Sequence, residues 1–159
     1  MKSELIFRKE SSSRGRYGDI NKRNLSIGAY FDDPAKWPYI LNVQITTKSF
    51  RSDDTYTDNE SYKLSKELYL SIKSVIKDAQ FKLAACSERI ENDTMDGAIE
   101  YFTFSVDGFE KHISGDEIFS SGAYEAEKAT TFGRSENYVI YTVISKIKAL
   151  LEAADIYVL

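Results

Sequence analysis

The sequence predicts an α+β fold, with an antiparallel sheet of about five to six strands and two amphipathic helices packed on one face as a two-layer sandwich. Several short segments alternate apolar and polar residues, which is typical of half-buried strands. An Asp-Gly pair separates two such segments, and two longer stretches carry apolar residues at helical spacing. At 159 residues the chain has the usual length of one domain, which we expect to span residues 1–159.

The N-terminal third reads as strands. Residues 4–8 predict a short strand, and the Ser- and Gly-rich residues 11–19 predict a mobile loop. Apolar residues alternate over 25–31 and again over 41–45, and both prolines of the chain flank the turn at 32–38. We therefore expect an antiparallel hairpin there.

The first helix is predicted over residues 61–79. The polar residues 51–60 lead into it, and Asp58 or Asn59 can accept a hydrogen bond from an unpaired backbone N–H as its N-cap. Its apolar stripe consists of Leu64, Leu68, Ile72, Val75, Ile76 and Ala79.

Two further strands are predicted at 82–90 and 98–106. The second ends at Asp107-Gly108, a pair that adopts the positive φ angles of a type I′ hairpin turn at little cost.

The C-terminal helix is predicted from an N-cap at Ser135 to about Ala154, and we expect residues 156–159 to pack against the body or to add a short strand. For residues 114–133 the pattern leaves helix and loop open.

Composition indicates a cytoplasmic protein. Cys86 is the single cysteine, so the chain can form no internal disulfide. The N-terminus has only a short apolar run, and no stretch approaches the roughly 20 apolar residues of a membrane span.

No catalytic residue, metal ligand or cofactor is predicted. His112 is the single histidine and falls on the polar side of a hairpin, so a Cys86–His112 pair is disfavoured. Residues 91–97 do not fit a calcium loop, because Thr94 and Thr103 stand where acidic ligands are needed. Neither a P-loop nor a dinucleotide-binding glycine pattern occurs.

Charge is uneven along the chain, whose net charge is −4. Residues 1–24 carry seven basic and three acidic groups, and the remainder carries 14 basic and 22 acidic groups. The basic segment 8–23 could contact nucleic acid, although the acidic remainder makes this the less favoured alternative. Its candidate residues are Arg14, Arg16, Tyr17, Lys22 and Arg23.

The acidic region 107–128 mixes carboxylates with aromatic residues, a combination that suits docking onto a basic protein surface. The predicted partner-binding residues are Asp116, Glu117, Phe119, Tyr124, Glu125 and Glu127.

In its size, acidic charge and lack of catalytic motifs the chain is similar to the bacterial immunity proteins that neutralise toxins inside the cell. That resemblance implies a non-enzymatic inhibitor of one protein partner with a basic surface. A nucleic-acid-associated protein and an enzyme with a carboxylate site are the alternatives. The sequence does not indicate the oligomeric state.

Overall fold

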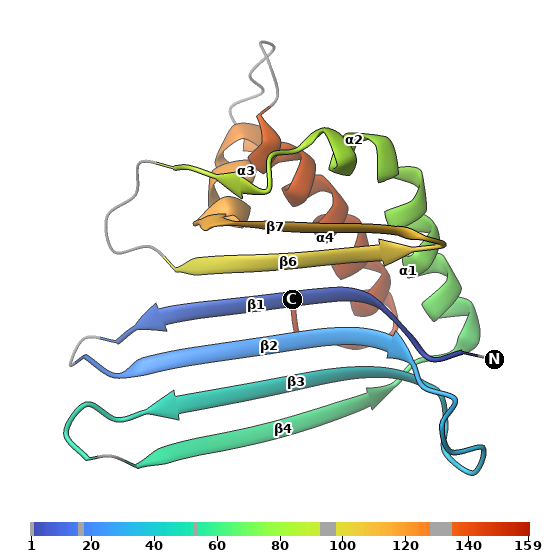
Figure 1. Cartoon of the computed structure of the whole chain (residues 1–159), viewed down its shortest axis with the longest axis horizontal. Helices are drawn as coiled ribbons and strands as arrows, with labels where there is room; N and C mark the ends of the chain where they lie inside the picture. Colours follow the sequence, from blue (N-terminus) through green and yellow to red (C-terminus); the bar gives the residue numbers. More distant parts are fainter. Residues whose placement is uncertain (1, 16–17, 53, 93–97, 128–134) are drawn as a thin grey trace.

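The computed structural model describes residues 2–15, 18–52, 54–92, 98–127 and 135–159. These residues form a seven-stranded open sheet with the strand order β4-β3-β2-β1-β6-β7-β5, antiparallel except for the pairing of β5 with β7. Four helices pack against one face of it, behind the strands in Figure 1. The predicted α+β class is confirmed, with more strands and more helices than the sequence indicated.

The strands are β1 (Glu4–Arg14), β2 (Ile20–Ala29), β3 (Tyr39–Lys48), β4 (Thr55–Lys63), β5 (Arg89–Ile90), β6 (Ile99–Val106) and β7 (Phe109–Asp116). The helices are α1 (Lys66–Asp78), α2 (Gln80–Ala85), α3 (Ile118–Glu127) and α4 (Glu136–Ala153).

The predicted hairpin of the N-terminal third is confirmed as β2 and β3, which pair antiparallel from Ala29 and Tyr39 at the turn. The loop predicted over 11–19 is wrong for its first residues. Ser11 and Ser12 belong to β1 and pair with β2 on one side and β6 on the other. Pairing on both sides satisfies the backbone there and outweighs the weak strand preference of serine.

The structure also corrects the region before α1. Residues 55–63, predicted partly as a polar lead-in and partly as helix, form β4. The N-cap of α1 is Ser65 rather than Asp58 or Asn59, and its hydroxyl accepts a hydrogen bond from Leu68 N at 3.1 Å. Since β4 carries no apolar alternation, hydrophobic periodicity had no signal to detect.

The strand predicted at 82–90 is wrong for most of its length. Helix α2 follows α1 directly in the chain, and only Arg89 and Ile90 form a strand. By contrast, the hairpin turn is confirmed, since Asp107 and Gly108 have φ angles of 45° and 87°.

The region 114–133, left open by the sequence, contains the end of β7 and helix α3, and its residues 128–133 lie outside the described ranges. Helix α4 begins after Ser135 as predicted. The terminal residues Ile156 and Val158 pack against the core but form no strand.

One hydrophobic cluster fills the space between the sheet and the helices. Phe7 and Phe104 lie at its centre on β1 and β6, fully buried, with ring centroids 5.6 Å apart. From the helices, Ile72, Ile76 and Ile144 face them as part of the same cluster. Within the described ranges, no helix is long and apolar enough to cross a membrane.

Candidate functional site

The helices do not cover the whole of the sheet. They lie behind β1, β6 and β7, whereas β3 and β4 extend beyond them (Figure 1). Ile45 on β3 is 41% exposed and Tyr56 on β4 is 66% exposed, although both side chains belong to the face on which the helices pack. The β4 end of this helix-covered face is therefore open.

The side chains of β4 on this face form a continuous row. Directly opposite residues in an antiparallel pair share one face, and Glu60 lies opposite Val43 whereas Asp58 lies opposite Ile45. Because Val43 is buried in the core cluster, Asp58 and Glu60 belong to the helix-covered face. We call this row the β4 strip; it consists of Tyr56, Asp58, Glu60 and Tyr62.

The β4 strip is acidic and exposed. Neither Asp58 nor Glu60 forms an ion pair with a residue in the described part of the chain. Glu60 accepts a hydrogen bond from the Tyr62 hydroxyl at 2.7 Å, which raises the pKa of that phenol. Two carboxylates on one face with the exposed ring of Tyr56 give a surface suited to a basic, partly apolar partner.

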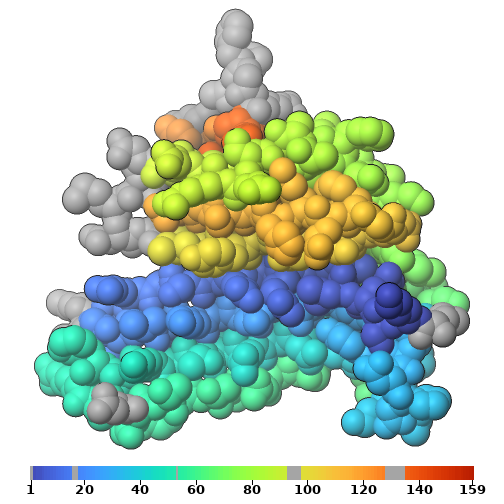
Figure 2. Space-filling view, viewed as in Figure 1, coloured from blue at the N-terminus to red at the C-terminus, as the bar shows by residue number. Residues whose placement is uncertain are grey.

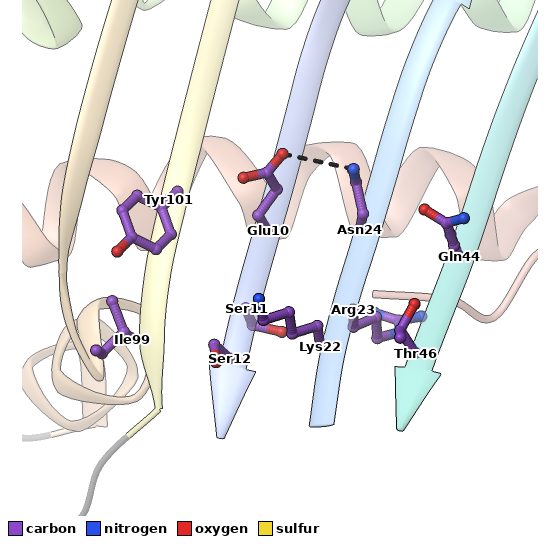
Figure 3. Close-up of a pocket in the computed structure, with 10 residues that line it drawn as sticks. All are labelled: Glu10, Ser11, Ser12, Lys22, Arg23, Asn24, Gln44, Thr46, Ile99 and Tyr101. Atoms are coloured by element: carbon purple, nitrogen blue, oxygen red, sulfur yellow. Dashed lines mark hydrogen bonds between the residues drawn. The ribbon is translucent and has the colours of Figure 1, made fainter. Parts of the chain in front are cut away.

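The opposite face of the sheet carries no helix (Figure 2). Its side chains are mostly polar, among them Glu10, Asn24 and Gln44. It contains a hollow of about 380 Å³, where Glu10 accepts a hydrogen bond from Asn24 and Tyr101 stands on β6 (Figure 3). Two buried polar atoms of this face, Arg8 Nε and Asn24 Oδ1, have no hydrogen-bond partner among the described residues.

The residues of the predicted acidic interface differ in how far their own chain engages them. The carboxylate of Glu117 accepts a hydrogen bond from Ala98 N, and that of Glu125 accepts one from the Ser135 hydroxyl. Phe119 is half-buried against Tyr141. Of the remaining predicted residues, Tyr124 and Glu127 are exposed, and Asp116 is half-buried at the end of β7.

The predicted nucleic-acid residues are divided between the two faces of the sheet. Arg14 and Lys22 belong to the helix-free face, Lys22 at the rim of the hollow. Arg23 points to the other face and donates a hydrogen bond to the carbonyl of Val158. Arg16 and Tyr17 lie outside the described residues.

The single histidine and the single cysteine do not form a pair. His112 is exposed on the helix-free face beside Thr103 and Glu110. Cys86 is buried in the core cluster, and burial raises the pKa of its thiol. A raised pKa keeps a thiol protonated and poorly nucleophilic. Most of the segment tested as a calcium loop, residues 93–97, lies outside the described ranges.

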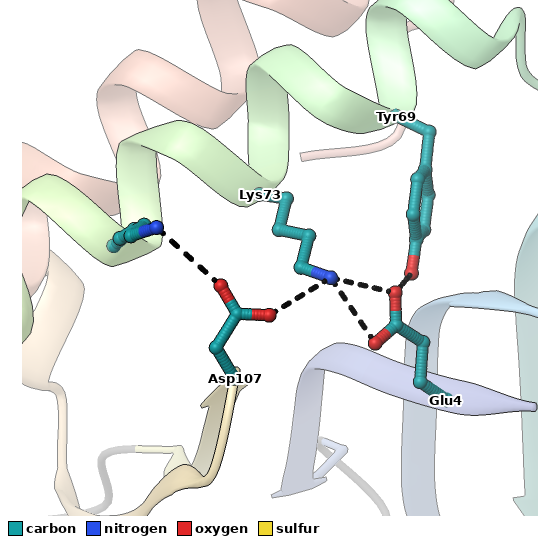
Figure 4. A network of polar contacts seen from close by, with 5 residues as sticks. Glu4, Tyr69, Lys73 and Asp107 are labelled. Atoms are coloured by element: carbon teal, nitrogen blue, oxygen red, sulfur yellow. Dashed lines mark hydrogen bonds and ion pairs between the residues drawn. The ribbon is translucent and has the colours of Figure 1, made fainter. Parts of the chain in front are cut away.

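A polar network joins β1, α1 and the β6–β7 turn (Figure 4). Lys73 Nζ lies 3.0 Å from Glu4 and 3.3 Å from Asp107, and the Tyr69 hydroxyl donates to Glu4 at 2.7 Å. Burial and the Glu4 hydrogen bond raise the pKa of Tyr69 far above its usual range. Desolvation is the largest single influence on Lys73 and lowers its pKa, but the hydrogen bonds and charges of Glu4 and Asp107 together outweigh it, so the pKa of Lys73 is raised. This network ties the helix layer to the sheet.

The Asp107 carboxylate makes the network sensitive to acid. The hydrogen bond from Lys73 lowers the pKa of Asp107 below its ordinary value of 3.8. A carboxyl whose folded pKa is lowered stabilises the fold above its unfolded pKa and loses that contribution as the pH falls through the folded value. We expect Asp107→Asn to lower the free energy of unfolding at neutral pH, with the difference from the wild type closing below about pH 4. Urea unfolding across that pH range measures it.

The matched control for this prediction is Asp78→Asn, since Asp78 is exposed at the end of α1 and forms no ion pair with a described residue. Asparagine also tolerates the left-handed φ of position 107, so the turn itself is kept. A constant gap between Asp107→Asn and the wild type down to strongly acidic pH would contradict the assignment.

Sequence reasoning missed the β4 strip. Its residues Tyr56, Asp58, Glu60 and Tyr62 stand at every second position, but the residues between them are polar as well, so the spacing gave no contrast. Propensity scales rank aspartate and asparagine low in strands, so the pattern resembled a loop.

Together these features define the class, a small α+β protein with an open seven-stranded sheet and an acidic, uncovered edge strand. No protein-family model matches the chain, and no curated protein matches it at a significant level.

Proposed function

We propose that this protein is a protein-binding module that inhibits one basic partner protein inside the cell, in the manner of a bacterial immunity protein. The observation that carries the proposal is the β4 strip, where Asp58 and Glu60 form no ion pair with a described residue and share one face with the exposed ring of Tyr56. The net charge of −4 acts in the same direction, because it attracts a basic partner over a longer range.

The geometry favours the β4 strip over the acidic region first predicted. Glu117 and Glu125 already accept hydrogen bonds from their own chain, so a partner would compete with these contacts. Asp58 needs no such exchange to meet a lysine or arginine of the partner, whereas Glu60 shares its carboxylate with the Tyr62 hydroxyl of the same strip. Tyr56 and Ile45 supply apolar area next to these charges.

The test is an affinity capture from native cell lysate at about 150 mM salt with nuclease present, where weak surface electrostatics are screened. Wild-type protein, Asp58→Lys/Glu60→Lys and Glu125→Lys/Glu127→Lys serve as baits. The two double variants change the net charge by the same amount, so they differ only in the surface that they alter. We expect the wild type to retain one stoichiometric basic protein and the β4 variant to lose it by at least about tenfold.

Each result has a clear meaning. Loss of the partner only in the Glu125→Lys/Glu127→Lys bait keeps the binding function and moves its site to α3. Absence of any protein partner, with nucleic acid retained when nuclease is omitted, contradicts the proposal and supports the basic segment around Arg14. A captured partner is then assayed for its own activity, which the wild-type protein should abolish at equimolar concentration.

A further inference from the structure

The free edge of β4 adds a second recognition element to the β4 strip. Strand β4 is nine residues long and forms one edge of the sheet. Its side chains are exposed at every position but Tyr62. Edge strands present unpaired N–H and C=O groups that can pair with a strand of another chain. Natural proteins commonly protect such edges with prolines, bulges, a covering segment or charged side chains, and β4 carries the charges of Asp58, Glu60 and Lys63. Strand β4 contains no proline, and its pairing with β3 is free of bulges.

The hydrogen bonds next to β4 show which of its backbone groups are free. Leu64 N donates to Tyr39 O, and Ser49 N donates to Asp54 O, one bond at each end of the β3–β4 ladder. In an antiparallel ladder, such directly bonded pairs recur at every second residue. The bonded residues of β4 are therefore Tyr56, Asp58, Glu60 and Tyr62. The alternate residues direct their N–H and C=O groups away from β3; these are Thr55, Thr57, Asn59, Ser61 and Lys63.

The charges of the β4 strip disfavour a second copy of this chain as the occupant. Pairing two β4 strands antiparallel about a twofold axis keeps each face continuous, so the strips of the two copies meet. In the most central registers Asp58 then lies opposite Glu60, or Asp58 opposite Asp58, or Glu60 opposite Glu60. Like charges directly opposite destabilise a strand pair.

We infer that β4 binds an extended basic segment of its protein partner by strand addition, with lysine or arginine side chains of that segment facing Asp58 and Glu60. The inference rests on the proposed function and names its mode of recognition. The free N–H and C=O groups of Thr57, Asn59 and Ser61 supply the backbone hydrogen bonds. The carboxylates of Asp58 and Glu60 favour a positively charged added strand, and Tyr56 packs against apolar side chains of that strand.

A defined peptide tests the strand addition without knowledge of the partner. The probe is a blocked synthetic peptide of the length of β4 that alternates lysine and threonine, compared with the same peptide carrying glutamate for lysine. We expect the lysine peptide to slow amide hydrogen exchange at Thr57, Asn59 and Ser61, measured by NMR, and to bind at least about tenfold more tightly than the glutamate peptide. Equal affinity for the two peptides, or binding without added protection in β4, would overturn the inference.

Asn59→Pro separates strand addition from simple charge attraction. It removes a free edge N–H and leaves the β3–β4 hydrogen bonds and both carboxylates in place. We expect it to weaken the lysine peptide about fivefold to tenfold, the effect of losing a backbone hydrogen bond and the close approach at the edge. Asn59→Thr changes the side chain but keeps the N–H, and should bind as the wild type does. Thr57→Pro removes a second free edge N–H and provides an independent test. Circular dichroism of both proline variants checks that each keeps the native fold.

The partner captured in the lysate experiment distinguishes the two levels of the proposal. If Asp58→Lys/Glu60→Lys loses the partner while Asn59→Pro retains it at full affinity, the binding function stands and strand addition is wrong. If both lose it while Asn59→Thr retains it, both are supported.

Discussion

Replacing Phe104 by alanine is expected to lower the free energy of unfolding by about 3 to 5 kcal/mol. The side chain is fully buried on β6, with its ring centroid 5.6 Å from that of Phe7 and 6.3 Å from that of Phe102. Truncation loses the transfer free energy of the ring and leaves a cavity at the centre of the core, which sheet residues on both sides prevent from collapsing. Urea unfolding followed by circular dichroism measures the loss.

Phe81→Ala is the matched control, because it is the same substitution at a position that is 88% exposed on α2. We expect it to change the free energy of unfolding by less than about 0.5 kcal/mol. Similar effects of the two substitutions would mean that the face of the sheet assigned to the core is wrong.

Replacing Gly122 by alanine is expected to lower the free energy of unfolding by about 1 kcal/mol or more. The helix preferences of glycine and alanine alone would predict the opposite sign. In a helix interior, alanine is favoured over glycine by about 1 kcal/mol. At Gly122, however, an added Cβ would lie 2.4 Å from Asn137 O and 2.5 Å from Tyr141 Cβ, where α3 crosses α4. Overpacking of this kind typically costs about 1 to 3 kcal/mol, so α3 and α4 must separate.

The test is whether Gly122→Ala lowers or raises the free energy of unfolding. Ser120→Ala, at an exposed position of the same helix, isolates the helix preference and should be neutral or slightly stabilising. Thermal unfolding of both variants measures the difference. Stabilisation by Gly122→Ala would show that the two helices do not approach each other at this glycine.

The elements that the sequence predicted correctly are those whose pattern is local. The alternation of Leu25, Ile27 and Ala29 identified the buried face of β2, and these three side chains are buried. Asp107-Gly108 identified its turn because few residues other than glycine, asparagine and aspartate adopt positive φ. The helical spacing of Val143 and Ile147 identified the inner face of α4.

The elements that could not be predicted from the sequence obtain their conformation from neighbours that are distant along the chain. Ser11 and Ser12 are strand residues because β2 and β6 lie on either side of them. Strand β4 exists because β3 supplies its hydrogen bonds, although Asp58 and Asn59 by themselves favour turns. Only two residues of the strand predicted at 82–90 pair with β7, and the preceding residues complete the helix layer.

The candidate site follows the same division. The sequence by itself determined the fold class, the uneven distribution of charge and the presence of acidic residues beside aromatic ones. Only the tertiary structure decided that Glu117 and Glu125 accept hydrogen bonds from distant parts of the chain, whereas Asp58 and Glu60 stand where the helix layer ends and form no ion pair with a described residue. Strand order is set by pairing between distant segments, and it alone makes β4 an edge with unpaired backbone groups.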